Sequence, residues 1–327
     1  MTQAFARLDH IVVAVRDLDA ATAAYGAVLG RVPSWRGRHP AYGTVNAIFG
    51  LERCYLELLA LAEPAPSHSP LARGGRAAGE RGEAPIGAAL AAYLASRTEG
   101  LFALALGSDD LDATAAALVG AGLTPSPITA GSAEAEDGTT RGWRTFALDR
   151  GETRGVTVFA IQHDLVGAPP SGASTAHGER RAPAPVPPSR AVGDPAATVR
   201  AIDHVVLFSD DLTGALALWC GTFGIHERWR REFPERGTVN VGLRLGGVTL
   251  ELVAPLTGDP GTRGERAWGL AYEVGDVDAA VARLRVAGVA ASDARTGLAP
   301  DTRVCTVKWT DRLPTLLIQH RAAAPRA

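Results

Sequence analysis

Two histidine–glutamate pairs recur at the same spacing in the two halves of the chain. His10 and Glu57 are 47 residues apart, and so are His204 and Glu251. An imidazole and a carboxylate together can bind a divalent cation or move a proton. The alternative is that each histidine and glutamate form a satisfied polar pair in the core of its own half.

The two pairs belong to an internal duplication. When the sequence is shifted by 194 residues, residues 7–60 fall on 201–254 without a gap, and 20 of the 54 positions are identical. The identities include Asp9-His10 on Asp203-His204 and the tetrapeptide Gly-Thr-Val-Asn that ends at Asn46 and at Asn240. Self-similarity of this kind predicts two structural copies of one unit.

A second, weaker pair of similar segments follows each copy. Residues 100–123 align with 268–289, and both stretches lead to an apolar strand that ends in Ile-Gln-His, at His163 and His320. Each quarter reads as one strand, one helix and three strands, which is an α+β pattern. In the first quarter Asp17 is placed to cap the helix and Gly30 to end it.

The predicted domain organisation follows from these repeats. A stretch rich in Pro, Gly and Ala over 165–198 cannot build a core and is expected to be a linker. The first domain is expected over 1–164, with modules at 7–61 and 100–163 around an insertion at 62–99; the second is expected over 199–321, with modules at 201–255 and 267–320.

Composition excludes several classes of protein. The formal net charge of −2 gives no global field that would attract nucleic acid or an anionic membrane. The three cysteines lie far apart, so no cysteine-based zinc cage is expected and a reducing, cytoplasmic compartment is favoured. The first apolar run is too short for a signal peptide or a membrane span.

Four βαβββ modules, with histidine on the first strand and glutamate on the fourth, resemble the vicinal oxygen chelate superfamily, which includes glyoxalase I, bleomycin-resistance proteins and extradiol dioxygenases. The opening LDHIVVAVRDLDAATAAYGAVLG, with RHPAYGTVNAIFG and YLELLA, looks most like its glyoxalase-like branch. The resemblance implies two cupped, mixed β-sheet half-barrels. Because one fold hosts many reactions, it does not specify the chemistry.

The resemblance also implies a metal site. His10 and Glu57, and in the second half His204 and Glu251, match the family's ligands for a divalent ion, which this donor set would allow to be Zn, Ni, Co, Mn or Fe(II). The other two family ligand positions carry Ala103 and Phe159, or Gly269 and Leu316. Two alternatives remain: His163 and His320 contribute through a shifted register, or the two His–Glu pairs face each other as one set. In a third case neither half binds metal.

Other residues are candidates for substrate binding. Asn46 and Asn240 can hydrogen-bond a substrate or orient the nearby glutamate, or else satisfy a strand edge. The repeated Trp35-Arg36 and Trp229-Arg230 can form an aromatic wall with a charge, or else cover sheet edges. His39 has Phe233 as its counterpart, so it favours the first half as the active one.

The resemblance therefore implies a metal-dependent lyase or isomerase that chelates adjacent oxygens of a small organic substrate and stabilises an enediolate, with Glu57 or Glu251 moving the proton. An extradiol-type dioxygenase is one alternative. A metal-free small-molecule-binding protein of the antibiotic-resistance type is another. The expected partner is a small molecule, and the protein is expected to be a monomer or homodimer.

Overall fold

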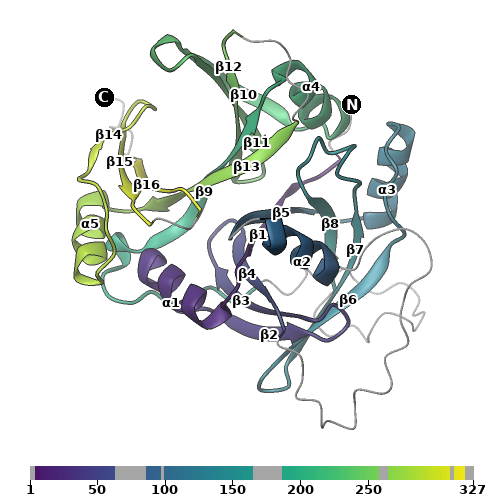
Figure 1. Ribbon diagram of the computed structural model, residues 1–327, viewed down its shortest axis with the longest axis horizontal. Helices are drawn as coiled ribbons and strands as arrows, with labels where there is room; N and C mark the ends of the chain where they lie inside the picture. Colours follow the sequence, from purple (N-terminus) through teal and green to yellow (C-terminus); the bar gives the residue numbers. More distant parts are fainter. Residues whose placement is uncertain are drawn as a thin grey trace, which may run out of the picture.

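The computed structural model of the protein describes residues 4–62, 86–96, 99–164, 186–257, 264–309 and 313–320. Its two halves lie side by side, and each is built around an eight-stranded mixed sheet (Figure 1). The fold is α+β, as the repeats predict.

In the first half the eight strands close into a barrel in the order β1-β4-β3-β2-β6-β7-β8-β5. In each module the first strand lies parallel to the fourth, and the modules meet where β1 runs antiparallel to β5. The elements are β1 (Arg7–Ala14), α1 (Leu18–Leu29), β2 (Trp35–His39), β3 (Thr44–Gly50), β4 (Tyr55–Leu61), α2 (Ile86–Ser96), β5 (Gly100–Gly107), α3 (Leu111–Gly120), β6 (Thr129–Ala135), β7 (Thr140–Ala147) and β8 (Val158–His163).

The second half repeats this order but remains an open sheet, β10-β11-β12-β9-β13-β16-β15-β14. Its elements are η2 (Pro195–Ala197), β9 (Val199–Ser209), α4 (Leu212–Leu216), η3 (Ala217–Thr222), β10 (His226–Phe233), η4 (Pro234–Arg236), β11 (Thr238–Leu245), β12 (Val248–Pro255), β13 (Glu265–Val274), α5 (Val277–Val286), β14 (Arg295–Thr296), β15 (Thr302–Val307) and β16 (Thr315–His320).

The expectation of two half-barrels is therefore met in the second half and modified in the first. In the first half, β2 pairs with β6 at Gly37–Ala135 and Arg38–Glu134, which closes the ring. The corresponding strand of the second half, β14, has only two residues, so it does not reach β10. A longer strand at one position converts a cup into a barrel.

Local sequence accounts for the helix starts. Asp17 accepts a hydrogen bond from the backbone N–H of Ala20 and begins α1, and Gly30, at φ 67°, ends it. Asp110, Asp211 and Asp276 cap α3, α4 and α5 in the same way. The predicted caps at Asp17 and Gly30 are confirmed.

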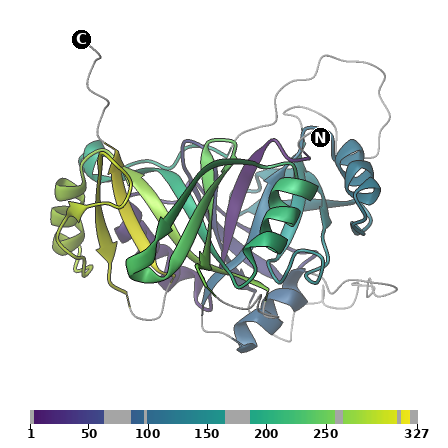
Figure 2. The same cartoon turned by 90° about the horizontal axis from the view of Figure 1, so that it is seen from above.

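The insertion contributes a helix to the first barrel. Leu90 and Leu94 of α2 are buried against Val12, Leu59 and Phe102, which come from β1, β4 and β5. Figure 1 shows α2 across the centre of the ring, and Figure 2 shows it at one end. This helix therefore covers one end of the barrel interior. Residues 63–85 of the insertion lie outside the described residues.

The two halves share one hydrophobic core. Phe5 packs edge-on against Phe223 with ring centroids 5.4 Å apart, and Tyr25 packs on Trp309 at 4.9 Å. The described part of the expected linker, 186–198, also packs on the first half, where Ser189 donates its backbone N–H to the carbonyl of Gly50. Residues 165–185 lie outside the described residues.

Candidate functional site

The site is built on a β-bulge in the first strand of each half. The pairing of β1 with β5 passes from Leu8 directly to His10, so Asp9 has no partner on the neighbouring strand. Adjacent residues of a regular strand point to opposite faces, and a bulge removes that constraint. The side chains of Asp9 and His10 therefore turn toward each other, with Asp9 Oδ1 2.8 Å from Nδ1 of His10.

His10 is held between two carboxylates inside the barrel. Its Nδ1 faces Asp9, and its Nε2 lies 3.4 Å from Oε2 of Glu57 on the adjacent strand β4. The Tyr55 ring stacks on the imidazole at 4.3 Å, and the edge of Phe159 lies at 5.5 Å. Only 3% of His10 is exposed, so its ring has little freedom to turn.

Glu57 also accepts a hydrogen bond from Asn46 and lies beside a second histidine. Nδ2 of Asn46 donates to Oε1 of Glu57 at 2.6 Å, and Nε2 of His39 lies 4.0 Å from the same oxygen. Nδ2 of Asn46 also lies 3.4 Å from Nε2 of His39, so this nitrogen is the acceptor. Nδ1 of His39 then carries the proton and donates to Oγ1 of Thr44 at 2.9 Å.

His163 joins the network at its other end. Its Nε2 donates to Oδ1 of Asp9 at 3.0 Å. It therefore lies on the Asp9 side of His10, and Glu57 lies on the opposite side. The preceding residue, Gln162, accepts the N–H of Leu111 at the start of α3. In the repeated tripeptide, the glutamine therefore binds the start of a helix, and the histidine binds the buried aspartate.

Burial and hydrogen bonding set the charges of this network. Burial alone would raise the pKa of Asp9, but hydrogen bonds from His10 and His163 hold that pKa well below its usual range. Burial is likewise outweighed at Glu57, where His10 and His39 lower the pKa to about 2. Burial opposes protonation of His10, but Asp9 and Glu57 raise its pKa above the ordinary value.

His39 is shifted in the opposite direction. Burial is the main cause that lowers its pKa; Glu57 opposes the shift, and the nearby cations His10 and Arg141 add to it. At neutral pH these directions favour a protonated His10, an ionised Glu57 and a neutral His39. One carboxylate therefore separates two imidazoles of different charge.

The second half contains the same network in a more open setting. Nδ1 of His204 lies 2.7 Å from Asp203, and its Nε2 lies 3.4 Å from Glu251. Asn240 donates to Glu251 at 2.7 Å, and His320 donates to Asp203 at 2.6 Å. The bulge recurs as well, because the pairing of β9 with β13 skips Asp203.

The two copies of the network differ in how far they are enclosed and in which side chains surround them. The side chain of His320 is 44% exposed, whereas that of its counterpart His163 is 11% exposed, because the second sheet does not close. Phe233 takes the place of His39. Each histidine lies beside the glutamate of its own half, so the four-residue set considered from sequence is not formed.

The two tryptophan–arginine pairs are split between faces. Trp35 points into the barrel and its indole lies over Gly37, where a Cβ atom would come within 2.6 Å of Nε1. Arg36 points outward and pairs with Asp19 of α1. In the second half Trp229 lies over Gly242 and is 38% exposed, while Arg230 pairs with the exposed Glu227.

Sequence reasoning missed several members of the site. Asp9 and Asp203 were visible only as identities of the repeat, although each orients a histidine. Tyr55 and Arg141 also line the interior, and Cζ of Arg141 lies 5.9 Å from the centroid of the Tyr55 ring. Neither has an identical counterpart in the second copy, so the repeat gave no signal for them.

The donor set does not fit the four-ligand metal cage that the resemblance implies. Within the described residues, no group of three or more His, Cys, Asp or Glu side chains is arranged to hold a metal ion. His10 and Glu57 supply two adjacent donors, but Ala103 and Phe159 have none. An extradiol site needs two histidines and one carboxylate around one point. His163 binds Asp9 through Nε2 and lies on the side of His10 away from Glu57, so these three residues do not form such a set.

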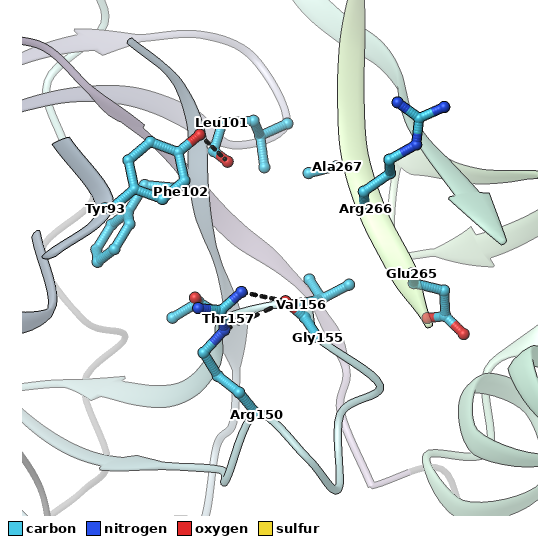
Figure 3. A pocket seen from close by; sticks show the side chains of 10 residues that line it. All are labelled: Tyr93, Leu101, Phe102, Arg150, Gly155, Val156, Thr157, Glu265, Arg266 and Ala267. Atoms are coloured by element: carbon cyan, nitrogen blue, oxygen red, sulfur yellow. Dashed lines mark hydrogen bonds between the residues drawn. The ribbon is translucent and has the colours of Figure 1, made fainter. Parts of the chain in front are cut away.

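A separate cavity of about 240 Å³ lies between the two halves (Figure 3). It is lined by Tyr93 of α2, Leu101 and Phe102 of β5, and by residues 265–267 of β13. Arg150 reaches across its wall to the carbonyl of Gly155. None of the residues of the His–carboxylate network lines it. Over the part of the chain that the structure describes, no helix is long and apolar enough to cross a membrane.

Comparisons with known proteins agree with this architecture. Residues 8–181 match the model of the glyoxalase-like domain family, and residues 203–306 match that of the glyoxalase/bleomycin resistance protein/dioxygenase superfamily. The first match spans more than half of the chain, so the protein belongs to the glyoxalase-like domain family. A search of curated proteins found no match.

Solved structures show the same tandem fold. A variant of 4-hydroxymandelate synthase from Streptomyces coelicolor is 15% identical, with a TM-score of 0.62 over 98% of this chain and 94% of its own. A Mn(II)-bound glyoxalase from Novosphingobium aromaticivorans is also 15% identical, with a TM-score of 0.58 over 98% and 83%. At this identity the likeness establishes the fold alone.

Proposed function

We propose that the first barrel is an enzyme active site for proton transfer at a carbon next to a carbonyl group of a small organic molecule, an isomerase or lyase reaction. One observation carries the proposal. His10 and His39 direct their Nε2 atoms at the two oxygens of one buried carboxylate, Glu57, inside a closed barrel. An acid and a base are thus held around one point.

The two histidines have complementary roles in this proposal. His39 presents an unprotonated Nε2 and accepts the proton from the substrate carbon. His10 donates a hydrogen bond, and then its proton, to the carbonyl oxygen as that oxygen becomes the hydroxyl of an enol. His39 then returns its proton to the same or the neighbouring carbon, and the enol hydroxyl returns a proton to His10 as the carbonyl re-forms, so both imidazoles are regenerated. The opposite pKa shifts of the two histidines support this assignment, because the pKa of His10 is raised and that of His39 is lowered.

Glu57 and Asp9 position the pair rather than carry the proton. A carboxylate whose pKa is lowered to about 2 is a weak base at neutral pH, so the shuttle role expected for Glu57 from sequence passes to His39. Asp9 fixes the ring of His10 through Nδ1 and leaves Nε2 directed inward. No step is assigned to a metal ion, because Ala103 and Phe159 lack donor atoms.

The second half contributes a weaker version of the site. It has the same His–Glu–Asn arrangement, but Phe233 replaces the base and the sheet is open. We therefore assign the reaction to the first half. A binding protein without turnover is the second candidate, favoured by the aromatic side chains of Trp35, Tyr55 and Phe159 around the network.

The experiment follows exchange of carbon-bound hydrogen by proton NMR in D₂O, using pyruvate and hydroxyacetone as small carbonyl probes. Wild-type protein is expected to accelerate loss of the signal next to the carbonyl. His39→Gln is expected to lower the rate by about 10²- to 10⁴-fold, the usual contribution of a general base. His226→Gln is the control, because it removes an exposed histidine of the second half that lies outside the network. No exchange with wild type, or equal rates in both variants, would overturn the proposal and leave the binding protein.

A further inference from the structure

Arg141 is a guanidinium placed on the inner face of the barrel. It lies on β7 two residues before Trp143, so the alternation of the strand puts both side chains on one face. The Trp143 ring lies edge-on to His39 at 5.6 Å. Arg141 therefore faces the same interior as the proposed base.

Two aromatic rings, from the two strands that flank β3, lie beside this guanidinium. Cζ of Arg141 lies 5.4 Å from the centroid of Trp35 on β2 and 5.9 Å from that of Tyr55 on β4. Tyr55 in turn stacks on His10. Aromatic faces attract a guanidinium but leave its N–H groups, which lie in its own plane, free to bind other groups.

Arg141 differs from the neighbouring arginines because it has no carboxylate partner. Arg36, Arg38 and Arg144, on strands β2 and β7, pair with Asp19, Glu134 and Asp112 respectively. Among the described residues, the side chain of Arg141 makes neither an ion pair nor a hydrogen bond, only its contacts with aromatic rings. A half-buried cation without a counter-charge is costly unless something supplies an anion.

A second unused donor lies at the same place. Nε1 of Trp35, in the ring that contacts Arg141, is buried and has no hydrogen-bond partner. A buried indole N–H ordinarily finds an acceptor. Two donors without acceptors, one of them charged, thus lie in one region of the barrel interior.

We propose that Arg141, with Nε1 of Trp35, binds a carboxylate group of the substrate. The guanidinium matches a carboxylate by two parallel hydrogen bonds, and the indole N–H supplies a further donor. This inference rests on the proposed function and deepens it: the substrate is a small carboxylic acid whose reacting carbon extends toward His10 and His39. The second half carries no arginine at the position that corresponds to Arg141, which agrees with the assignment of the reaction to the first half.

The test measures binding without turnover. Isothermal titration calorimetry with pyruvate and benzoate is compared with titration by their uncharged counterparts, hydroxyacetone and benzamide. Wild type is expected to bind at least one carboxylate and to bind its counterpart about tenfold or more weakly. Arg141→Met is expected to weaken carboxylate binding by about ten- to a hundredfold, the range for a hydrogen bond to a charged group.

Further variants separate recognition from folding. Trp35→Phe keeps an aromatic ring beside Arg141 but removes the N–H, so binding is expected to weaken about three- to tenfold. Arg141→Lys keeps the charge and loses the paired geometry, so an intermediate loss is expected. Arg144→Gln is the control, since Arg144 is paired with Asp112 on α3, and its binding is expected to match wild type. Circular dichroism verifies folding of each variant.

The outcomes distinguish this inference from the function on which it rests. If no carboxylate binds, or if Arg141→Met and Arg144→Gln weaken binding equally, the carboxylate site is wrong. If binding depends on Arg141 but wild type catalyses no hydrogen exchange, the site stands and the enzyme function fails. If exchange of hydroxyacetone equals that of pyruvate and survives Arg141→Met, the enzyme function stands and the carboxylate site is wrong.

Discussion

The carboxylate of Asp9 lies 2.8 Å from Nδ1 of His10, its neighbour in the sequence, because a β-bulge turns both side chains to one face of the sheet. The same carboxylate accepts a hydrogen bond from His163 at 3.0 Å. One buried group thus connects the first strand of one module to the last strand of the other.

Removing the charge of Asp9 is expected to destabilise the protein. In Asp9→Asn the amide replaces an acceptor of two hydrogen bonds that is only 8% exposed, so the free energy of unfolding is expected to fall by about 1–3 kcal/mol. Urea unfolding at pH 7 measures it. Asp203→Asn is the matched control and is expected to cost less, because Asp203 lies in the open sheet with 17% of its side chain exposed. Equal losses would contradict the role of enclosure.

The stability of the protein is expected to fall in acid through Glu57. Its pKa is about 2 in the folded protein against 4.5 ordinarily, so its ionised form favours folding. This contribution, about 3 kcal/mol, is complete above about pH 4.5 and is lost as the pH falls toward 2. Unfolding at a series of pH values is expected to show a shallower acid loss in Glu57→Gln than in wild type; parallel curves would contradict the assignment.

His10 is expected to make the stability of the protein fall as the pH rises. Its pKa is raised, so the stability from its protonated form is fully present below about pH 6.5 and declines as the pH rises through the folded pKa. In His10→Gln this decline is expected to disappear. An unchanged alkaline arm would show that His10 is neutral in the folded protein.

Metal content separates acid–base chemistry from the metal-dependent reaction that the resemblance implies. Because two positions of the four-ligand set carry Ala103 and Phe159, we expect less than one equivalent of metal in protein purified without chelator, and hydrogen exchange unaffected by EDTA. Mass spectrometry of the metal content measures the first. One equivalent that is lost in His10→Ala, together with exchange that stops in EDTA, would instead establish a metal centre in the first half.

The repeat carried most of what could be predicted. It identified four modules, the α+β fold and the residues His10, Glu57 and Asn46, because these recur at fixed offsets. Family membership and the tandem fold are confirmed. The bulge at Asp9 was not predictable, since alternation along a strand says nothing of where one residue is skipped.

Barrel closure and the arginine of the interior escaped prediction for a different reason. The pairing of β2 with β6 joins residues about a hundred positions apart, and no local pattern encodes which strand edges meet. Arg141 and Tyr55 belong to one copy only, so a comparison of the copies does not reveal them. The features that distinguish the halves are those that a repeat conceals.

Gly131 is expected to be required for the position of Trp143. The two residues are paired across β6 and β7, and a Cβ atom at 131 would lie 2.4 Å from Nε1 of Trp143. Gly131→Ala is therefore expected to cost about 1–3 kcal/mol and, by moving the ring that contacts His39, to slow hydrogen exchange. Gly120→Ala, in α3 with open space around it, is the control and is expected to gain at most about 1 kcal/mol. Thermal unfolding compares them; a neutral Gly131→Ala would contradict the packing.

The two halves are expected to unfold together, because they share one core and one buried ion pair. Nε of Arg154 in the first half donates to Oε1 of Glu265 in the second at 2.5 Å, and Trp219 donates to Oε2 at 2.8 Å. Glu265→Ala removes the acceptor of Trp219 and of Nε of Arg154, while Nη2 of Arg154 keeps Asp211 at 3.2 Å, so a loss of about 1–3 kcal/mol is expected. Glu265→Gln keeps an acceptor and shape, and burial already raises the pKa of Glu265, so this variant is expected to lose less.

The control for this interface is Glu227→Ala, which breaks an exposed pair with Arg230 and is expected to change stability by no more than about 1 kcal/mol. Differential scanning calorimetry of wild type is expected to give one transition whose calorimetric and van't Hoff enthalpies agree. Two transitions, of which only one shifts in Glu265→Ala, would show that the halves fold independently in spite of the contacts of Phe5 with Phe223 and of Tyr25 with Trp309.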